Sequence, residues 1–598
     1  MGSKKCNSQL SDALRAAGLK PTKKNSSSKI PEKKPSIKSR QTVIGDLLGS
    51  GHENNVGREL RGLLIGGAEN KRSNGSATSN NIQVSAAKTN VDGPAQYPPV
   101  ISLMHPHRLV KRGSFRPHPL LDPSGDASAI LSKMLLVGHE KQIAKKPADA
   151  TTFVIGLDFG TSATKVVLRD IYRDLAFPVP FYACHKGVEQ YLLSSGVYRT
   201  GTSWSLIGGK QRMRDLKLRL LKAQDEEAGD EFNDCCAFLA LVIRRCRAWL
   251  LSEHGKEYSK HEIEWRLNLG IAARSYEDRR TVLRFRRLAW AAANIAAQVT
   301  TEVSYQMVDA FRLRSRMAIE GDVQAEGDEF RSDQIDVVPE ISAQLQGFMR
   351  SARWDWSNRP IMMLVDIGAG TVDSALFSVK VHGTSSRLTF FSNRVDQNGV
   401  INLHRNRLVW LEEAARLSNA EKAVFNYLAA ESGPTDRLRP IPESVCDYVP
   451  GYFVECEGLD ADAIFLKERY RLQVAGCIQD ARVGKGLTSN DLKRMPLLLC
   501  GGGSRMDYFS QVTDIINATP GWSFKVEKQT MPVPEDLADF GMNSNEFDRI
   551  SVAYGLSLVG NVNESIGEVI RAIEVPPLRP LNSNVVRNRP EIISKDQM

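Results

Sequence analysis

The sequence predicts an α/β fold in which one strand–turn–strand pattern occurs twice. The segment TTFVIGLDFGTSATKVVLRD, residues 151–170, has the pattern of an apolar strand, a Gly/Thr/Ser turn and a second strand. The segment IMMLVDIGAGTVDSALFSV, residues 361–379, repeats this pattern, and Asp366 stands 208 residues after Asp158. Apolar residues also recur at helical spacing, as in FLALVIRRCRAWLL at 238–251. Strands that alternate with helices are typical of α/β proteins.

The first turn has the composition of an anion-binding loop. Gly160 lets the backbone come close to an anion, and the N–H groups of such a turn converge on one space. Asp158, at the end of the apolar strand, is a carboxylate of the kind that holds a magnesium-bound water. For this segment taken alone, a plain hairpin turn with a capping aspartate is the alternative interpretation.

Further elements follow in order along the chain. The stretch 213–251 is helix-like, and 267–299 reads as a buried strand, a loop and a long helix. VVPEISAQLQGF, at 337–348, predicts a helix that starts at Pro-Glu, because proline suits the first helical turn. LLLCGGGSRM, at 497–506, is a third apolar strand that ends in glycines.

Taken together, these elements resemble the motifs of the ATPase superfamily that contains actin, DnaK-type heat-shock chaperones and sugar kinases. DFGTSATK resembles the phosphate-1 loop, DIGAGTVD the phosphate-2 loop, GGGSR the adenosine motif, and PEISAQ the connecting segment between the phosphate loops. RVDQNGVINLHRNRL, at 394–408, resembles the glycine-led helix entry that follows the phosphate-2 loop. The resemblance covers residues 151–560 and is closest to the DnaK-type ATPase domain. It implies a two-lobed actin-like ATPase fold, with duplicated ribonuclease-H-like sheets flanked by helices, that closes over ATP and Mg²⁺.

The expected organisation has four parts: a basic extension at 1–149, a first lobe at 150–345, a second lobe at 346–562 and a C-terminal tail at 563–598. Residues 1–150 carry 24 Lys and Arg against 11 Asp and Glu, a net charge of +13. Runs rich in Lys, Ser and Pro predict that the extension is largely disordered, with short amphipathic helices. Such a segment is expected to attract an acidic partner or nucleic acid, and a solvated tail is the alternative.

The resemblance implies which residues bind the nucleotide and the metal. Asp158 and Asp366 are expected to hold the hydrated Mg²⁺, and Arg505 to stack on the adenine. The other residues expected to bind ATP lie in the three glycine-rich turns: Gly160, Thr161, Ser162, Gly368, Gly370, Thr371, Gly501, Gly502, Gly503 and Ser504.

Three charged residues near these turns have structural alternatives. Lys165 resembles the lysine of actins and sugar kinases that reaches the β-phosphate, and an exposed strand lysine is the alternative. Asp373 completes the DxGxGTxD pattern, and it either serves the phosphate site or bonds to its own turn. Lys217 resembles a chaperone lysine that reaches the γ-phosphate, and the alternative is a lysine on a helix surface.

Glu340 is expected to orient the attacking water, with Asp366 and Lys217 completing the catalytic set. The resemblance implies this role, because Glu340 follows the proline of the connecting segment. A glutamate in the first turn of a helix is also favoured by the helix dipole without any catalysis. Both interpretations stay open at the level of the sequence.

These features favour a cytoplasmic, ATP-hydrolysing protein that acts as a chaperone-like nucleotide switch on an unidentified partner or client. An actin-like protein that forms filaments for a cytoskeleton or for DNA segregation is one alternative, and a small-molecule kinase of the sugar type is another. The pattern GxxxxGK[ST] does not occur, which excludes a P-loop enzyme. No run approaches about eighteen apolar residues, so no membrane-spanning helix is expected. The nine cysteines show no CxxC spacing, which favours reduced thiols.

Overall fold

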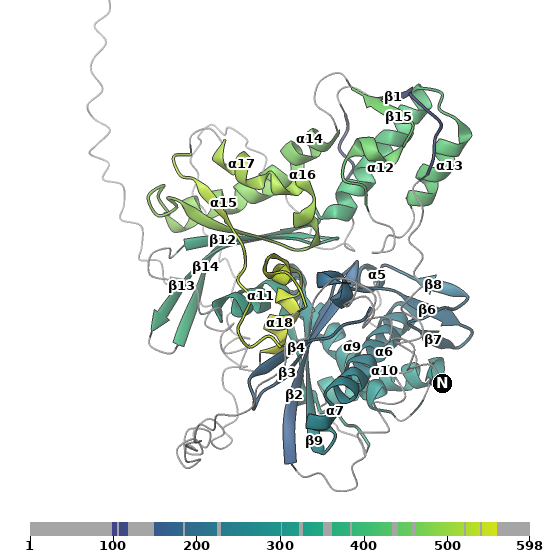
Figure 1. Cartoon of the computed structure of the whole chain (residues 1–598), viewed down its shortest axis with the longest axis vertical. Helices are drawn as coiled ribbons and strands as arrows, with labels where there is room; N and C mark the ends of the chain where they lie inside the picture. The colour runs from purple at the N-terminus through teal and green to yellow at the C-terminus, as the bar shows by residue number, and fades with distance from the viewer. Residues whose placement is uncertain are drawn as a thin grey trace, which may run out of the picture. The chain divides into compact units, whose positions relative to one another are not determined.

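Two large β-sheets with the same strand order form the framework of the computed structural model (Figure 1). It describes residues 98–103, 107–117, 149–182, 186–223, 229–298, 300, 302–321, 327–350, 361–382, 385–432, 441–456, 461–518, 522–538 and 541–558. The mixed α/β fold that the sequence predicts is confirmed. The predicted disorder of the extension up to residue 97, and the predicted C-terminal tail, lie outside the described residues.

The first sheet has the strand order β11-β9-β2-β3-β4, and a short strand, β5, also pairs with β3. The central strand β2 runs antiparallel to β3 and parallel to β9. β4 continues the antiparallel side and β11 the parallel side. The strands are β2 (Asp149–Phe159), β3 (Ala163–Asp170), β4 (Leu175–Pro178), β5 (Leu193–Ser194), β9 (His261–Ile271) and β11 (Ile335–Pro339).

The second sheet repeats this arrangement in the order β14-β13-β12-β16-β17. The central strand β12 runs antiparallel to β13 and parallel to β16, and β14 and β17 extend the two sides in the same senses. The predicted repeat of the hairpin is therefore part of a repeat of the whole sheet. The strands are β12 (Ile361–Ile367), β13 (Val372–His382), β14 (Ser385–Asp396), β16 (Met495–Cys500) and β17 (Val526–Gln529).

Helices and a small sheet complete the first half. The long helix α6 packs against α9, and α9 packs against α10. Asp278 begins α9 by accepting hydrogen bonds from two backbone N–H groups, and Ser304 begins α10 in the same way with one. The helices are α5 (Leu216–Lys222), α6 (Gly229–Glu253), α7 (Gly255–Tyr258), α8 (Ala273–Tyr276), α9 (Arg279–Ala297) and α10 (Tyr305–Glu320). The small sheet contains β10 (Val303–Ser304), β7 (Ser203–Ser205), β6 (Val197–Thr200) and β8 (Gln211–Met213).

The second half has its own helices. α15 packs against β13 and β14, and it ends where Gly486 adopts a φ of +67°, a conformation that glycine takes without steric cost. The helices of this half are α12 (Val400–Leu417), α13 (Lys422–Glu431), α14 (Ala461–Phe465), the π-helix Leu466–Tyr470, α15 (Arg471–Lys485), α16 (Asp507–Ser510) and α17 (Val512–Asn517). The two halves together contain short 3-10 turns at Gly187–Tyr191, Ser332–Gln334, Val445–Tyr448, Gly502–Arg505 and Ser544–Arg549.

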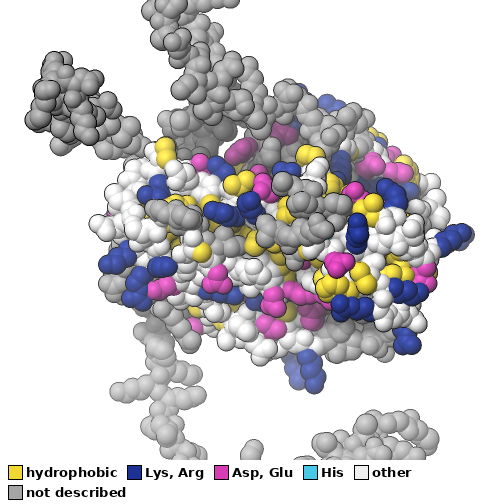
Figure 2. All heavy atoms as spheres, turned by 90° about the horizontal axis from the view of Figure 1, so that it is seen from above, with side chains coloured by type: hydrophobic (Ala, Val, Ile, Leu, Met, Phe, Trp, Pro, Cys, Tyr) yellow, Lys and Arg dark blue, Asp and Glu magenta, His cyan; other side chains and the backbone are white. Residues whose placement is uncertain are grey.

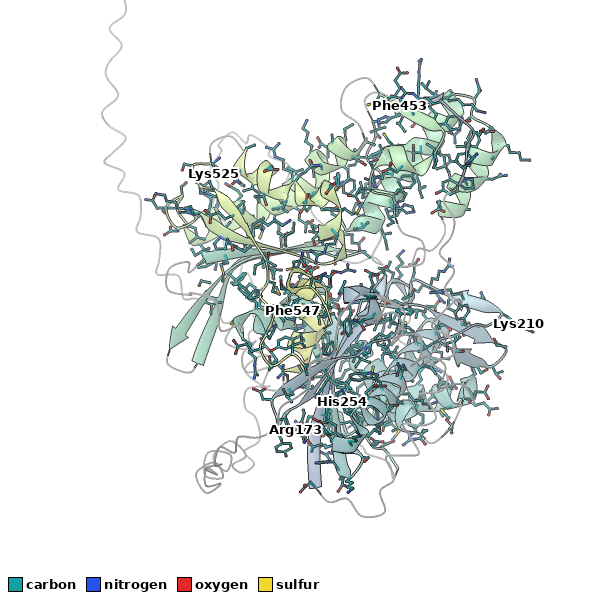
Figure 3. The ribbon with its side chains drawn as sticks, in the orientation of Figure 1. Arg173, Lys210, His254, Phe453, Lys525 and Phe547 are labelled. Carbon is teal, nitrogen blue, oxygen red and sulfur yellow. The ribbon has the colours of Figure 1, made fainter. Side chains whose placement is uncertain are left out.

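Two helices connect the sheets. α11 (Glu340–Met349) and α18 (Ser551–Ser557) pack closely, because a side chain on Gly555 would overlap the carbonyl oxygen of Ala343. α18 also lies against β2, where a side chain on Gly156 would overlap the backbone of α18. A third buried cluster, which includes Phe547 (labelled in Figure 3), combines apolar residues of both sheets with residues of α11 and α18. The helices therefore belong to one core with both sheets.

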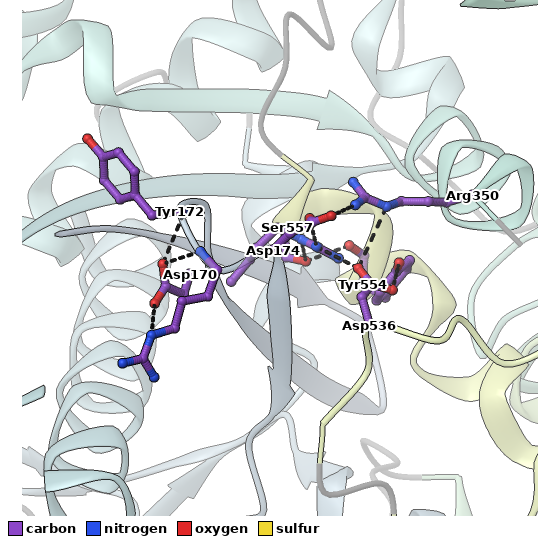
Figure 4. Close-up of polar contacts among 9 residues, drawn as sticks. Asp170, Tyr172, Asp174, Arg350, Asp536, Tyr554 and Ser557 are labelled. Atoms are coloured by element: carbon purple, nitrogen blue, oxygen red, sulfur yellow. Dashed lines mark hydrogen bonds and ion pairs between the residues drawn. The ribbon is translucent and has the colours of Figure 1, made fainter. Parts of the chain in front are cut away.

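An ion-pair network supports α18 on the side of β3 (Figure 4). Nη1 of the buried Arg169 lies 2.9 Å from Oδ1 of Asp174 and 2.6 Å from Oδ2 of Asp536. The hydroxyl of Tyr554 donates to Asp536 Oδ1 at 2.6 Å, and Arg350, after the end of α11, pairs with Asp174. Because its members come from four separate parts of the chain, the network ties both connecting helices to the first sheet.

Residues 98–103 and 107–117 pack on the second half, although the sequence assigned them to an extension that reaches residue 149. β1 (Arg108–Lys111) pairs antiparallel with β15 (Tyr452–Glu455). The physical reason is local apolar content: Leu109 is buried in the second core and Val100, Ile101, Leu103 and Phe115 pack against that core, whereas the average composition of the long basic segment hid this pattern. The described fold thus includes chain that precedes the predicted boundary.

The surface carries charges of both signs. On the face that Figure 2 shows, Lys and Arg side chains are intermixed with Asp and Glu side chains, in line with the net charge of −3 that the sequence carries beyond residue 150. Within the described residues, none of the helices has the length and apolar character needed to cross a membrane.

The crossing of α11 and α18 predicts that Gly555→Ala destabilises the protein. The added methyl group would meet the backbone of Ala343, which cannot move aside as a flexible side chain would, and overpacking of this kind costs about 3 kcal/mol. Gly484→Ala, also within a helix, is the matched control, because nothing lies within 4 Å of the added atom. Chemical denaturation should show a loss of stability for Gly555→Ala and no loss for Gly484→Ala. Equal stability of the two variants would contradict the described crossing.

Candidate active site

The two hairpins place corresponding residues at the same positions. Asp158 of β2 lies opposite Lys165 of β3, and Asp366 of β12 lies opposite Asp373 of β13. In each pair the second residue follows the first by seven positions, because four residues separate the last paired positions of each hairpin, Phe159 with Thr164 and Ile367 with Val372. Each first aspartate stands one residue before the end of its strand. The repeat of the fold therefore produces two equivalent carboxylates at the carboxyl ends of the two central strands.

The first turn, residues 160–162, connects β2 with β3 and is held from outside. Ser195 Oγ donates to the carbonyl oxygen of Gly160 at 2.6 Å, and Ser195 N–H donates to the carbonyl oxygen of Ser162 at 3.0 Å. Ser195 is fully buried and also lies 2.9 Å from Thr164 Oγ1. Sequence reasoning missed Ser195, because a serine in the loop segment SSG carries no motif of its own.

The second turn, residues 368–371, connects β12 with β13 and is held by a helix. The N–H groups of Val400 and Ile401 donate to the carbonyl oxygens of Gly368 and Ala369 at 3.2 and 2.8 Å. Gly399, just before α12, leaves the room for this contact, since a side chain there would meet the turn's backbone. The glycine-led helix that the sequence predicts after this turn is thus confirmed as α12.

The glycine-rich turns converge. An ideal Cβ on Gly370 would lie 3.3 Å from Thr161 Oγ1 and 3.8 Å from Leu218 Cδ2 of α5. The third turn, after β16, meets the second half's aspartate: Gly501 has a φ of +82°, and a side chain there would overlap Asp366. Gly502, Gly503, Ser504 and Arg505 form the 3-10 turn that follows. The structure therefore brings the predicted residues of all three turns into one region.

Two lysines each pair with a carboxylate in this region. Lys165 Nζ lies 2.8 Å from Asp158 Oδ2, so Lys165 is not a free exposed lysine of the strand. Lys217, on α5, is buried and its Nζ lies 2.6 Å from Oε1 of Glu340, the first residue of α11. Lys217 therefore does not lie on a helix surface. The pairing connects residues 123 positions apart.

Burial and like charges shift the acid–base behaviour of the second hairpin. Burial raises the pKa of Asp366 to about 7; the ammonium of Lys165 opposes this shift, and the carboxylates of Glu340 and Asp158 add to it. Burial also raises the pKa of Asp373 well above its usual range, with Glu340 and Asp366 contributing through repulsion. Asp373 accepts a hydrogen bond from Thr371 Oγ1 at 3.0 Å, so it bonds to its own turn. The cluster thus contains four carboxyl groups, of Asp158, Glu340, Asp366 and Asp373, and only two lysines.

Arg505 has neighbours on the side of the third turn. Its Nη2 donates to the carbonyl oxygen of Asn545 at 2.9 Å, and it pairs with Asp548. Ser504 Oγ donates to the carbonyl oxygen of Gly501 at 2.8 Å, which closes the turn. The guanidinium of Arg505 is thus held by the segment 545–548, which precedes α18.

Comparison with known proteins adds no relative: no protein-family model matches the chain, and no curated protein is significantly similar to it in sequence. Among the described residues, no group of three or more His, Cys, Asp or Glu side chains is arranged to ligate a metal directly.

The raised pKa of Asp366 predicts how stability depends on pH without a ligand. An aspartate has an ordinary pKa of about 4. The folded protein therefore binds more protons than the unfolded chain between about pH 4 and pH 7, and the free energy of unfolding falls as pH rises through that window. Asp366→Asn removes this titration, so its stability relative to the natural chain should rise from pH 4 to pH 7 and then stay level.

Chemical denaturation at a series of pH values in the presence of a chelator measures this difference. Asp514→Asn, an exposed aspartate of α17, is the control for the loss of one charge. If the two variants show the same pH dependence, Asp366 does not lie in the crowded, buried cluster described above.

Proposed function

We propose that the chain binds ATP together with Mg²⁺ and hydrolyses the ATP, as a member of the superfamily of actin, DnaK-type chaperones and sugar kinases. One observation carries the proposal: two equivalent hairpin turns, with Asp158 and Asp366 beside them, converge near the Lys217–Glu340 pair. The shared strand order of the two sheets supports it, since the superfamily is built from two ribonuclease-H-like sheets of related topology. The third turn, residues 501–505, lies against Asp366 and supports the proposal that the adenosine part of ATP binds there.

The charge of the cluster fits a divalent cation. Asp158, Glu340, Asp366 and Asp373 contribute four carboxylates, and the pKa of Asp366 is raised to about 7 by burial and by repulsion from neighbouring carboxylates. A cation between the hairpins would relieve this repulsion and allow Asp366 to ionise fully. Mg²⁺ keeps several of its waters in proteins, and we propose that Asp158 and Asp366 hold it through such waters. Bound Mg²⁺ would neutralise charge on the phosphate oxygens.

The residues of the chain have separate tasks in this proposal. N–H groups of the turns at 160–162 and 368–371 bind phosphate oxygens, as backbone nests do. Lys165 donates to the β-phosphate from its place beside Asp158. Arg505 presents its guanidinium to the face of the adenine. The nucleotide thereby contacts both halves of the fold at once.

Glu340 is the proposed proton acceptor for hydrolysis. Its carboxylate accepts a proton from the attacking water, and Lys217 holds the carboxylate in position. The water oxygen bonds to the γ-phosphorus, the bond from that phosphorus to the bridging oxygen breaks, and the electron pair leaves with ADP. Because α11 starts at Glu340, a change in the nucleotide would act on the helix that also packs against α18.

We propose that nucleotide state changes how the two halves close, and that this change acts on a partner as a chaperone-like switch. α11 and α18 support this proposal, because they pack against each other within a cluster that contains residues of both sheets. A cytoplasmic location and an unidentified client remain predictions of the sequence. The two alternative functions are filament formation and transfer of phosphate to a small molecule, and the experiments below distinguish the proposal from them.

Glu340→Gln should keep ATP affinity while hydrolysis falls by roughly ten- to a thousandfold, the usual effect of losing one positioned acid–base group. Calorimetric titration with ATP and Mg²⁺ measures the affinity, and phosphate release without an added acceptor measures turnover. Glu302→Gln, which removes an exposed carboxylate, is the matched control and should change neither quantity.

Other outcomes separate the alternatives. Wild-type turnover in Glu340→Gln would reduce Glu340 to a helix-start carboxylate that pairs with Lys217. Phosphate transfer that needs an added acceptor would favour a kinase, and ATP-dependent pelleting would favour a filament. Absence of ATP binding by the unaltered chain would remove the proposal as a whole.

A further inference from the structure

Residues 98–103 and 107–117, here termed the strap, lie across α12, α13 and β15 of the second half (Figure 1). We term the described residues between 406 and 461, which contact the strap, the seat. β1 of the strap pairs antiparallel with β15, with Leu109 opposite Val454, and both side chains are buried. Phe453, labelled in Figure 3, marks β15 in the view with side chains. The two-stranded sheet therefore packs one apolar face on the second core.

The seat binds the backbone of the strap at separated points. Ile101 N–H donates to Asn406 Oδ1 at 2.9 Å, and Trp410 Nε1 donates to the carbonyl oxygen of Ile101 at 2.8 Å. Leu109 N–H donates to Ser418 Oγ at 2.7 Å. Three polar side chains of one helix and its end thus bind the backbone of an extended segment, which also pairs main chain to main chain with β15, as in β-strand addition.

A glycine of the seat accommodates the end of the strap. The N–H groups of Arg112 and Gly113 both donate to the carbonyl oxygen of Gly451, at 2.8 and 2.9 Å. Gly451 has a φ of +95°, and an ideal Cβ there would lie 2.6 Å from the carbonyl oxygen of Ser114. A residue other than glycine would be strained and would push the strap away.

Side chains add specific contacts in the middle and near the end of the strap. The ring of Phe115 meets the rings of Tyr427 and Tyr452 edge to face, with centroids 5.5 and 6.5 Å apart. His107 is buried, and its Nε2 accepts a hydrogen bond from the N–H of Ala461 at 3.0 Å. The seat thus has partners for apolar, aromatic and polar groups of the strap.

The strap is basic and meets acidic residues. Residues 98–117 contain four Lys and Arg and no Asp or Glu. Lys111 Nζ lies 3.5 Å from Glu421 Oε1, and Arg108 is opposite Glu455 in the register of the strands. Exposed pairs of this kind contribute little energy, but they favour a basic segment over an acidic one.

The strap is separate in sequence from the rest of the fold. Residues 118–148, which number 31, stand between it and β2. The contacts named above join the strap to residues 406–461, and none of them depends on whether strap and seat belong to the same copy of the chain. A second copy offers the same strap with the same contacts.

We propose that the strap is an exchangeable strand: the seat accepts the strap of a second copy, and two copies associate by exchanging their straps. An isologous exchange of one element is a low-cost route to a dimer, because it makes no contact that the single copy lacks. The covalent connection raises the local concentration of a copy's own strap, so exchange prevails when the protein is concentrated. The proposal does not depend on nucleotide binding.

The test uses the full chain with a specific protease site placed between residues 118 and 148. After cleavage, the N-terminal fragment should remain with the body in size-exclusion chromatography. An excess of a fluorescent peptide of residues 98–117 should displace it and show saturable binding by anisotropy. The control peptide carries Leu109→Asp, which should bind about tenfold or more weakly because the carboxylate would have to be buried.

A second arm uses full chains with two different tags. Mixed at high concentration, they should co-purify, and they should not when both carry Leu109→Asp. If the two peptides bind equally, or if neither binds, the seat does not recognise the strap as a separate strand and the proposal fails. Tagged natural chains that stay separate at high concentration would overturn exchange between copies. In the first arm the substitution is in the peptide, so the folding of the protein body is unchanged.

Discussion

The close crossing of α18 with α11 and with β2 is the constraint on which the candidate site depends. Gly156 and Gly555 lack side chains where α18 approaches the sheet and the other helix, so the backbones come into contact. Asp158 stands one residue before the end of β2 on one side of this crossing, and Glu340 begins α11 on the other. The spacing between the proposed metal-binding residue and the proposed proton acceptor is therefore set by backbone packing rather than by flexible side chains.

The charge of the candidate site follows from this packing. Two equivalent aspartates meet because two equivalent strands end at the same place, and the protein pairs only some of the resulting negative charge with Lys165 and Lys217. Burial of the remainder keeps the pKa of Asp366 near 7. Perturbed carboxylates of this kind are common at functional sites, because a ligand can supply the missing positive charge.

Sequence reasoning found what depends on short segments and missed what depends on distant ones. The hairpins and the start of α11 were predictable, since strand alternation, glycine turns and Pro339 act locally. The pairing of Lys217 with Glu340 was not, because it joins residues that only the tertiary fold brings together. The support of the first turn by Ser195 escaped for the same reason. The strap was placed in the extension, because the average composition of a long basic segment hid the buried Leu109.

The most direct test of the account is hydrogen exchange, followed by mass spectrometry, with and without ATP and Mg²⁺. If the nucleotide binds between the two hairpins and the third turn, backbone amides of 158–162, 366–371 and 501–505 should all become protected together. Full protection should require ATP and Mg²⁺ together, and it should appear in both halves of the fold. Protection confined to one hairpin, or found only outside the three turns, would contradict the central claim that the repeated hairpins form one nucleotide site.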